Sequence, residues 1–565
     1  MHRFFSVLSM GLIVAATAAC SSEDAGPRLE AGAAVVDVTP DFEPYTDSDG
    51  DGDWDPGEPF EDADGDGELD SLWLGGFGAR RPTGVHDPLQ ARSLAIRIDG
   101  RLWVLTAVDA LGLSLGRIAA IRRAALARLP AESAPPIEQL MVASTHSHSA
   151  PDSIGVFAPG SLEAGWDADY LDALQRGAAD SIVAAVEALE PAELVVATAA
   201  AGDGFVRDLD PPAILDPTVG ILQLRRPDGS GLATAVSIAN HPEAVWKDNT
   251  LISADYPGVL RAELEARYGG VGLYFSGALG LMQSPAELAE RDFARADRLG
   301  AMYVERVAAA LAEAEPLRAA ALRPRFAAAE VPCCLQNLEL LLAIEAGVVE
   351  GYAQALYDDG PGGCAQQLVD LPISALRLGA AWTLVTLPGE LTPELIRGGI
   401  VAPAGYAGPY PDAPAEPHLE QHLSTEHRFL LGLAQAEVGY IYPKRTYWPE
   451  EIFGQRHGPG PDVAMTLVTL PGELTPELIR GGIVAPAGYA GPYPDAPAEP
   501  HLEQHLSTEH RFLLGLAQAE VGYIYPKRTY WPEEIFGQRH GPGPDVAMSL
   551  MTALGELLDG LGQTG

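Results

Sequence analysis

One long duplication limits what this chain can fold into. Residues 383–465 and residues 466–548 are identical at every position, from TLVTLPGELTPELIRGG to GPGPDVAM. Solenoid repeats are shorter, come in several units and diverge in sequence, because each unit packs in its own surroundings. A single identical pair does not fit that pattern. We therefore expect one working unit that is written twice, with the second copy surplus.

Without the second copy, the chain has the length of one large enzyme-sized domain with additions. We expect a main domain that carries the function, preceded by an export segment and followed by the surplus copy. The expected boundaries are a signal peptide over 1–19, a tether over 20–30, the main domain over 31–465 with an acidic insertion over 47–70, the surplus copy over 466–548 and a C-terminal helix over 549–565.

The first twenty residues, MHRFFSVLSMGLIVAATAAC, have the pattern of an export signal. A basic start precedes an apolar run that is too short to span a membrane, and small residues lead to Cys20. TAAC resembles the cleavage box of bacterial lipoproteins, in which the cysteine becomes the lipidated N-terminus. We expect an exported protein anchored to a membrane by this lipid, on the periplasmic or cell-surface side. Ordinary secretion with cleavage at a small-residue site is the alternative.

Export also permits disulfide bonds. Cys333, Cys334 and Cys364 remain once Cys20 is assigned, so one disulfide is expected and its pairing stays open. A metal site is the weaker interpretation of these three cysteines, because no CxxC pair is present.

The negative charge excludes one class of partner and points to one class of ion. A formal net charge of −42 argues against nucleic acid, because phosphate binding needs a basic face. Within the insertion, DSDGDGDWDPGE has the oxygen-ligand spacing of an EF-hand calcium loop, with Gly52 at its sixth position. We expect structural Ca²⁺ rather than a calcium switch, since prolines replace the flanking helices; a solvated acidic loop is the alternative. The candidate calcium ligands are Asp47, Asp49, Asp51, Asp53, Asp55 and Glu58.

A second acidic run, which starts at Asp62, keeps most of this spacing but has Trp73 where the bidentate glutamate should be.

Short apolar runs alternate with amphipathic helical patterns over 29–316, which predicts an α/β fold with a mixed, largely parallel sheet flanked by helices. Turns are expected at PDGSG and near Gly379. In open α/β sheets, ligands bind at the carboxyl ends of strands. Polar residues follow five expected strands, which predicts one site there: Asp109, His146, His241, Ser284 and Glu390.

Histidines give that site its chemistry. STHSHSAPD supplies His146 and His148, and NHPEAVW supplies His241. A catalytic zinc ion typically takes three protein ligands and keeps one position for water, so two histidines and a carboxylate such as Glu390 would complete a set.

Within the duplicated unit, HLEQH places His418 and His422 one helical turn apart, with His427 nearby. The glutamate is not in the HExxH position, so an exposed polar helix face is a better interpretation of this segment than a second metal site.

Six motifs occur in the order found in the neutral/alkaline non-lysosomal ceramidase family, which the chain resembles from about Gly32 to Tyr440. They are AGAAVVDVTP, GVHDPLQARSLAI, STHSHSAPDS, NHPEAV with ISADYPGVL, FSGALGLMQSP and LPGELT. The resemblance implies that the main domain is a zinc amidohydrolase whose metal-activated water cleaves the N-acyl amide of ceramide or a similar lipid amide.

The resemblance also implies roles for particular residues. His146, His241, Glu390 and Tyr440 match the zinc ligands, and Glu473 with Tyr523 is the alternative pair from the second copy. We favour Glu390 and Tyr440, because the strand of the first copy follows ALRLGAAW and completes a hairpin, whereas the second copy lacks that partner. His148, Arg207, Ser284 and Tyr440 match residues that act on the substrate; for Ser284, a turn-forming serine before Pro285 is the alternative.

Two departures keep the substrate open. The segment GLMQSPA lacks an acidic residue and an asparagine of the family's GDVSPN-type segment, and the chain has no room for the C-terminal β-sandwich of well-known ceramidases. The same metalloamidase chemistry on a different N-acyl compound is therefore one alternative, and a non-catalytic, calcium-dependent surface binding protein is another. No GxSxG motif supports a serine hydrolase.

Overall fold

The architecture was obtained as a computed structural model. It describes residues 28–48, 50, 53–131, 133–160, 163–202, 204–209, 213–285, 288, 291–335, 338–351, 367–401, 405, 410–413, 416, 418–447, 473–474 and 523–524. Outside the described residues lie the signal peptide with Cys20, the calcium candidates Asp49 and Asp51, Cys364, the C-terminal helix and most of the second copy. The predictions for these segments stay predictions.

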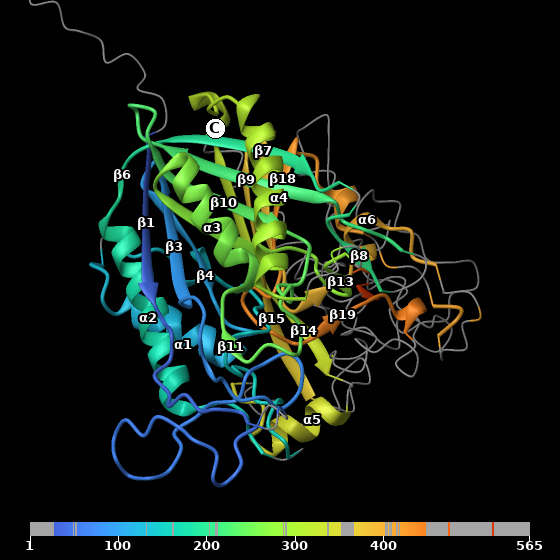
Figure 1. The fold of residues 1–565 in the computed structure, drawn as a ribbon. Helices are drawn as coiled ribbons and strands as arrows, with labels where there is room; N and C mark the ends of the chain where they lie inside the picture. The colour runs from blue at the N-terminus through green and yellow to red at the C-terminus, as the bar shows by residue number, and fades with distance from the viewer. Residues whose placement is uncertain are drawn as a thin grey trace, which may run out of the picture.

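The first sheet carries helices α1 and α2 on its outer face (Figure 1). Strands β1, β3 and β4 pair antiparallel, and β5 adds in parallel to β4 because α1 forms the crossover between them. Side chains cap both helices, Ser114 at α1 and Asp167 at α2. The sheet has the order β5 (Leu140–Ser144), β4 (Arg101–Val108), β3 (Gln90–Ile98), β1 (Leu29–Asp37) and β6 (Glu190–Pro191), with α1 at Leu115–Leu126 and α2 at Ala168–Glu187.

The second sheet is covered by α3 and α4, which pack against each other. Its strands β9 and β10 form the hairpin expected at PDGSG, where Gly229 adopts a φ of +85°. Strand β12 pairs in parallel with β10 after the crossover through α3. The order is β12 (Val271–Ser276), β10 (Gly231–Ile238), β9 (Thr218–Arg225) and β7 (Glu193–Ala200), with α3 at Asp255–Tyr268 and α4 at Phe293–Ala312.

The third sheet contains the first copy of the duplicated unit. Strands β15 and β16 form the hairpin expected near Gly379, whose φ is +54°, and β16 continues into the first copy. The order is β14 (Pro324–Leu335), β15 (Gln367–Leu378), β16 (Trp382–Thr386) and β18 (His427–Leu431), with α5 at Leu338–Glu345.

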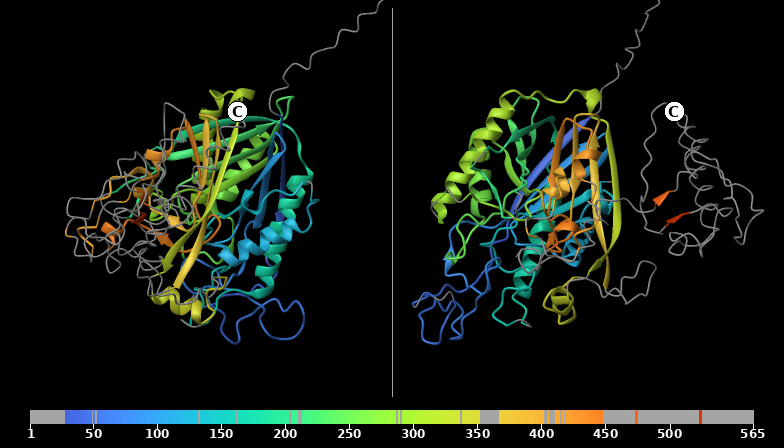
Figure 2. Two further views of the ribbon diagram at one scale, coloured as in Figure 1. Left: turned by 180° about the vertical axis from the view of Figure 1, so that it is seen from behind. Right: turned by 90° about the vertical axis from the view of Figure 1, so that its right-hand side faces the viewer.

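One apolar core joins the three sheets. Trp103 of the first sheet, Phe275 of the second and Phe429 of the third belong to the same buried cluster. The views in Figure 2 show the helices on the outside of the stacked sheets and the acidic insertion as loops that project from the body.

Short strand pairs and single turns complete the described chain. They are β2 (Gly84–Val85) with β11 (Leu251–Ile252), β8 (Arg207–Asp208) with β13 (Met282–Gln283), β17 (Glu390–Leu391) with β19 (Tyr440–Ile441), β20 (Glu473–Leu474) with β21 (Tyr523–Ile524), the short helix α6 (Glu394–Arg397), and 3₁₀ turns at Ile137–Gln139, Ala319–Ala321, Leu419–His422 and Lys444–Thr446.

The predicted mixed α/β class is confirmed, but the strand pairing differs from the expected largely parallel sheet. In the three main sheets only β4–β5, β10–β12 and β16–β18 are parallel. The other pairs are antiparallel, and several join strands that follow each other through tight turns, which only antiparallel partners can use.

Two further expectations can be compared with the fold. The helical face expected at HLEQH is wrong: His418 is extended and the following residues form a 3₁₀ turn, so His418 and His422 do not share a helix face. Among the described residues, no helix is both long and apolar enough to cross a membrane.

Candidate metal centre

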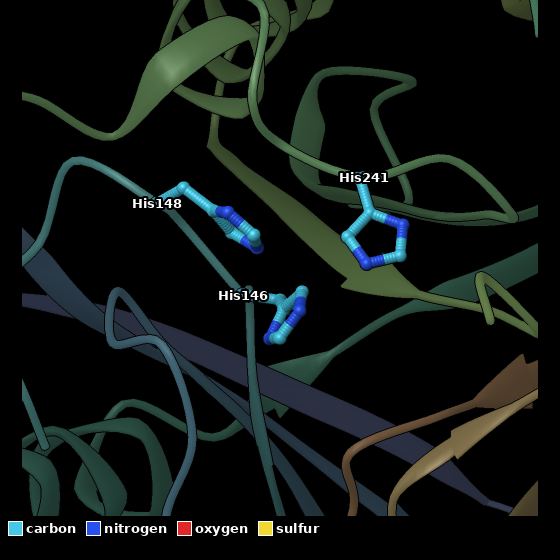
Figure 3. Close-up of side chains that lie close together, drawn as sticks. All are labelled: His146, His148 and His241. Atoms are coloured by element: carbon cyan, nitrogen blue, oxygen red, sulfur yellow. The ribbon is translucent and has the colours of Figure 1, made fainter. Parts of the chain in front are cut away.

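Strand ends bring the candidate ligands together. Strand β5 ends just before His146, β10 ends just before His241, and β17 starts at Glu390. Tyr440 starts β19 and lies directly opposite Glu390 in the parallel register of these two strands. His148 follows two residues after His146, and Figure 3 shows the three imidazoles converging from two loops.

His146 occupies a strained backbone conformation. Its φ is +68°, in the left-handed region that residues with a Cβ rarely adopt. The conformation is held because the His146 N–H donates to the Ala110 carbonyl at 3.0 Å and the ring is only 5% exposed. Strain of this kind persists where surrounding contacts fix it, and it is common at functional sites.

Backbone carbonyls fix the tautomers of two histidines. Nδ1 of His146 donates to the Leu111 carbonyl at 2.6 Å, and Nδ1 of His241 donates to the Met282 carbonyl at 2.8 Å. A carbonyl oxygen can only accept, so the proton of each neutral ring is on Nδ1. Each ring therefore presents the lone pair of Nε2, as in metal sites where an outer partner orients the ligand.

These two nitrogens face one carboxylate. Glu390 Oε2 lies 3.0 Å from Nε2 of His241 and 3.5 Å from Nε2 of His146, and the Tyr440 hydroxyl lies 3.4 Å from Nε2 of His241. Burial raises the pKa of Glu390, but positive charge at His146 and His241 outweighs burial and holds that pKa well below its usual range. When both rings are neutral, their Nε2 lone pairs repel the carboxylate, so a bound cation is needed to supply that charge. The donor set therefore fits a bound metal ion.

His148 is the third imidazole of this cluster. Ligand atoms of His146, His148 and His241 lie within 4.8 Å of one another, so three imidazoles are an alternative set for a metal ion. Burial lowers the pKa of His148 well below its ordinary value. The ring packs edge-on against Phe77, with centroids 4.9 Å apart, and against the backbone of Gly76.

Arg207 starts β8, and Ser284 comes directly after its partner strand β13. Arg207 pairs with Gln283 across β8 and β13, and its guanidinium donates to the Gln283 side chain at 3.0 Å. Ser284 follows Gln283 and is 4% exposed, with an unpartnered hydroxyl. In the described part of the chain, no hydrogen bond or ion pair joins either residue to the histidines or to Glu390.

Asp109 forms a buried ion pair beside the candidate ligands and is not itself one of them. Its carboxylate binds both terminal nitrogens of Arg261, at 2.7 and 2.8 Å, and accepts the Thr145 hydroxyl at 3.1 Å. Both members of this ion pair are buried. Asp109 therefore fixes the segment that carries His146.

Two buried glutamates near the centre were not predicted. Burial raises the pKa of Glu243 to about 7, and burial together with the charge of Glu390 raises the pKa of Glu437 well above its usual value. Glu243 is part of the NHPEAVW motif, so its position two residues after His241 was a usable signal. Glu437 lies in AEVGY, where nothing in the sequence marks it.

The acidic insertion folds back on itself. Glu58, at the twelfth position of the loop, accepts the Ser48 N–H at 2.6 Å and the Asp55 N–H at 3.2 Å. Asp47 accepts the Gly50 N–H at 2.6 Å. Asp53 instead pairs with Arg81 at 2.7 Å.

At the second acidic run, carboxylates of Glu43, Asp62 and Asp64 gather with ligand atoms within 4.8 Å of one another. Glu43 comes from upstream of the run.

Comparisons with known proteins give a match in structure and none in sequence. No protein-family model matches the chain, and no curated protein matches it. A solved structure described as a ceramidase complexed with C2 has a TM-score of 0.55 and 16% identity, covering 78% of this chain and 73% of its own. A neutral ceramidase from Pseudomonas aeruginosa has a TM-score of 0.54 and 17% identity, covering 78% and 72%. The chain therefore has the fold of these ceramidases, as the motifs predicted.

Gly76 and Gly78 provide a matched test of how His148 is held. Both glycines have positive φ, +96° and +94°, but a Cβ at Gly76 would lie 2.5 Å from His148 Cγ whereas one at Gly78 meets nothing within 4 Å. Gly76→Ala and Gly78→Ala both introduce backbone strain, and only Gly76→Ala also displaces the imidazole. We expect Gly76→Ala to lose roughly 1–3 kcal/mol more free energy of unfolding, measured with urea. Equal losses would show that the ring does not pack on this loop.

Proposed function

We propose that this protein is a zinc-dependent amidohydrolase that cleaves the N-acyl amide bond of ceramide or a similar lipid amide. The observation that carries the proposal is the convergence of His146, His241 and Glu390, with both imidazole Nε2 atoms directed at one carboxylate oxygen. The ceramidase fold and the six family motifs support the same activity.

His146, His241, Glu390 and Tyr440 would hold the metal ion. Two neutral imidazoles and a carboxylate are a typical catalytic zinc set, which leaves a position for water. Bound zinc lowers the pKa of a water molecule and polarises a carbonyl, so an unreactive amide can be attacked without a protein nucleophile.

Other residues would bind and orient the amide. Tyr440 and Arg207 are candidates to donate hydrogen bonds to the charge that develops on the amide oxygen, and His148 is a candidate to bind the amide group. Phe77 lies beside His148, and its ring centroid is 5.2 Å from that of Trp246. These aromatic rings would give the acyl chain an apolar surface next to the reacting group.

A non-ceramide N-acyl substrate is the second candidate. Glu243 adds a buried carboxyl near His148, Glu437 adds one near Glu390, and GLMQSPA departs from the family pattern. Fatty acid release from a panel of ceramides and other N-acyl compounds separates the two candidates.

Metal analysis tests the ligand set. We expect the purified protein to hold one equivalent of zinc, and a chelator to remove both the zinc and the amidase activity. His146→Ala and His241→Ala should each lose the zinc. His86→Ala is the control, because His86 is stacked on Phe293 and is not part of the cluster. Full zinc content in either ligand variant would contradict the assignment. A protein that binds calcium and a surface lipid but no zinc would instead be a non-catalytic binding protein.

The second copy contains Glu473, the equivalent of Glu390, and substitution of Glu473 is the control for substitution of Glu390. Strands β20 and β21 pair Glu473 with Tyr523 in the same parallel register as β17 and β19, so this pairing does not distinguish the copies. Strand β15 pairs with β16, which runs into the first copy. We expect Glu390→Gln to lower amidase activity by at least about 10- to 100-fold, since even the loss of a group that orients a metal ligand has an effect of that order. Glu473→Gln, and a chain lacking 466–548, should keep both zinc and activity; the opposite result would move the site to the second copy.

We also propose that the acidic insertion binds a structural Ca²⁺ ion, because Glu58 closes the loop onto Ser48 and Asp55. Calcium at 100 times its dissociation constant should raise the free energy of unfolding by about 2.7 kcal/mol, measured by thermal unfolding. Glu58→Gln should abolish most of that gain, and Glu61→Gln, an exposed neighbour, should retain it. A loop that only carries solvated charge would give no gain in any variant.

A further inference from the structure

His148 differs from the other two histidines in how its ring is held. Nδ1 of His146 and Nδ1 of His241 each donate to a backbone carbonyl. Both ring nitrogens of His148 are buried and have no hydrogen-bond partner. Buried polar groups without a partner are rare in folded proteins, so a nearby acceptor for this ring is expected.

Glu243 is the acceptor within reach. Its Oε2 lies 3.9 Å from Nδ1 of His148, which is an ion-pair distance and slightly too long for a hydrogen bond. The carboxylate is also buried, and its other oxygen, Oε1, has no partner. The buried ring of His148 and the buried carboxylate of Glu243 therefore face each other at 3.9 Å, and each has an atom without a hydrogen-bond partner.

Nδ1 is the nitrogen of His148 that faces Glu243. Gly76 and Phe77 contact the ring on one side, while the rings of His146 and His241 lie 4.8 and 5.5 Å away by their centroids. A bond from Nδ1 to Glu243 leaves Nε2 as the nitrogen with a free lone pair. The group that accepts the Nδ1 proton then differs among the three histidines: it is a neutral backbone carbonyl for His146 and His241, and a carboxylate for His148.

We propose that Glu243 is a positioning residue for His148. Its carboxylate accepts a hydrogen bond from Nδ1–H of His148, fixes the tautomer, and directs the Nε2 lone pair toward the amide group of the substrate. The effect on the substrate depends on the proposed amidohydrolase function, whereas the hydrogen bond between Glu243 and His148 does not depend on it. With Glu243 in this role, His148 binds the substrate, and the metal ion is held by His146, His241, Glu390 and Tyr440.

Arg207 is the competing partner for Glu243. The positive charge of Arg207 acts on the Glu243 carboxyl, and the Nε atom of Arg207 is buried without a partner. If Glu243 served Arg207 instead, its removal would leave the His148 ring unchanged.

The hydrogen bond can be tested without any substrate. In protein labelled with ¹⁵N-histidine, we expect a downfield Nδ1–H resonance that disappears in His148→Ala and is thereby assigned. It should also disappear in Glu243→Ala and shift but persist in Glu243→Gln, because the amide oxygen of glutamine can still accept. Glu394→Gln is the control, since Glu394 is another buried glutamate with an unpartnered oxygen. A resonance that is unchanged in Glu243→Ala would overturn the proposal.

Kinetics then separate positioning from metal binding. Glu243→Ala should lower kcat about 10- to 100-fold with KM changed less than about threefold and zinc retained, as for other orienting residues. The double variant Glu243→Ala/His148→Ala should be no slower than His148→Ala alone, because Glu243 acts through His148. Additive losses, or loss of zinc in Glu243→Ala, would overturn the proposal. A wild-type protein that hydrolyses no lipid amide would contradict the proposed function, while the resonance test would still decide the role of Glu243.

Discussion

The buried ion pair between Asp109 and Arg261 is the interaction on which the arrangement of the centre depends. Its two hydrogen bonds, at 2.7 and 2.8 Å, join the end of β4 to helix α3, and so connect the first sheet to the second. Removing one partner of such a pair leaves an uncompensated buried charge, at about 3–5 kcal/mol. Because Asp109 also accepts the hydroxyl of Thr145, the same carboxylate fixes the residue that precedes His146.

Backbone strain is concentrated around the same centre. His146, Asp255 and Leu281 have φ values of +68°, +57° and +63°, although none is glycine. Leu281 comes just before Met282, whose carbonyl orients His241, and Asp255 accepts the N–H of Val245, four residues after His241. Each such residue costs on the order of 1–3 kcal/mol, so the three-sheet core must supply the stability that keeps these conformations in place.

Sequence patterns predicted some parts of the fold and the site and missed others, for physical reasons. Helix and strand periodicity identified the α/β class and both hairpins, because local alternation and turn residues decide them. Periodicity does not state which strands pair, so the antiparallel majority was not foreseen. Motif order placed His146, His241, Glu390 and Tyr440 in one site, and the structure brings them together. Glu437 was missed, since a lone glutamate becomes informative only when its burial is known.

The matching registers of β17–β19 and β20–β21 have a consequence for how the chain folds. Because the two copies have the same sequence, each contains the strand sequence that pairs with β15, so two segments of the chain can compete for one place. Chain connectivity separates them: the first copy reaches β15 through a tight turn, while the second must close a much longer loop, at a cost that grows with the logarithm of its length. During synthesis the first copy also leaves the ribosome earlier. Order along the chain, rather than chemical difference, therefore favours the first copy as the partner of β15.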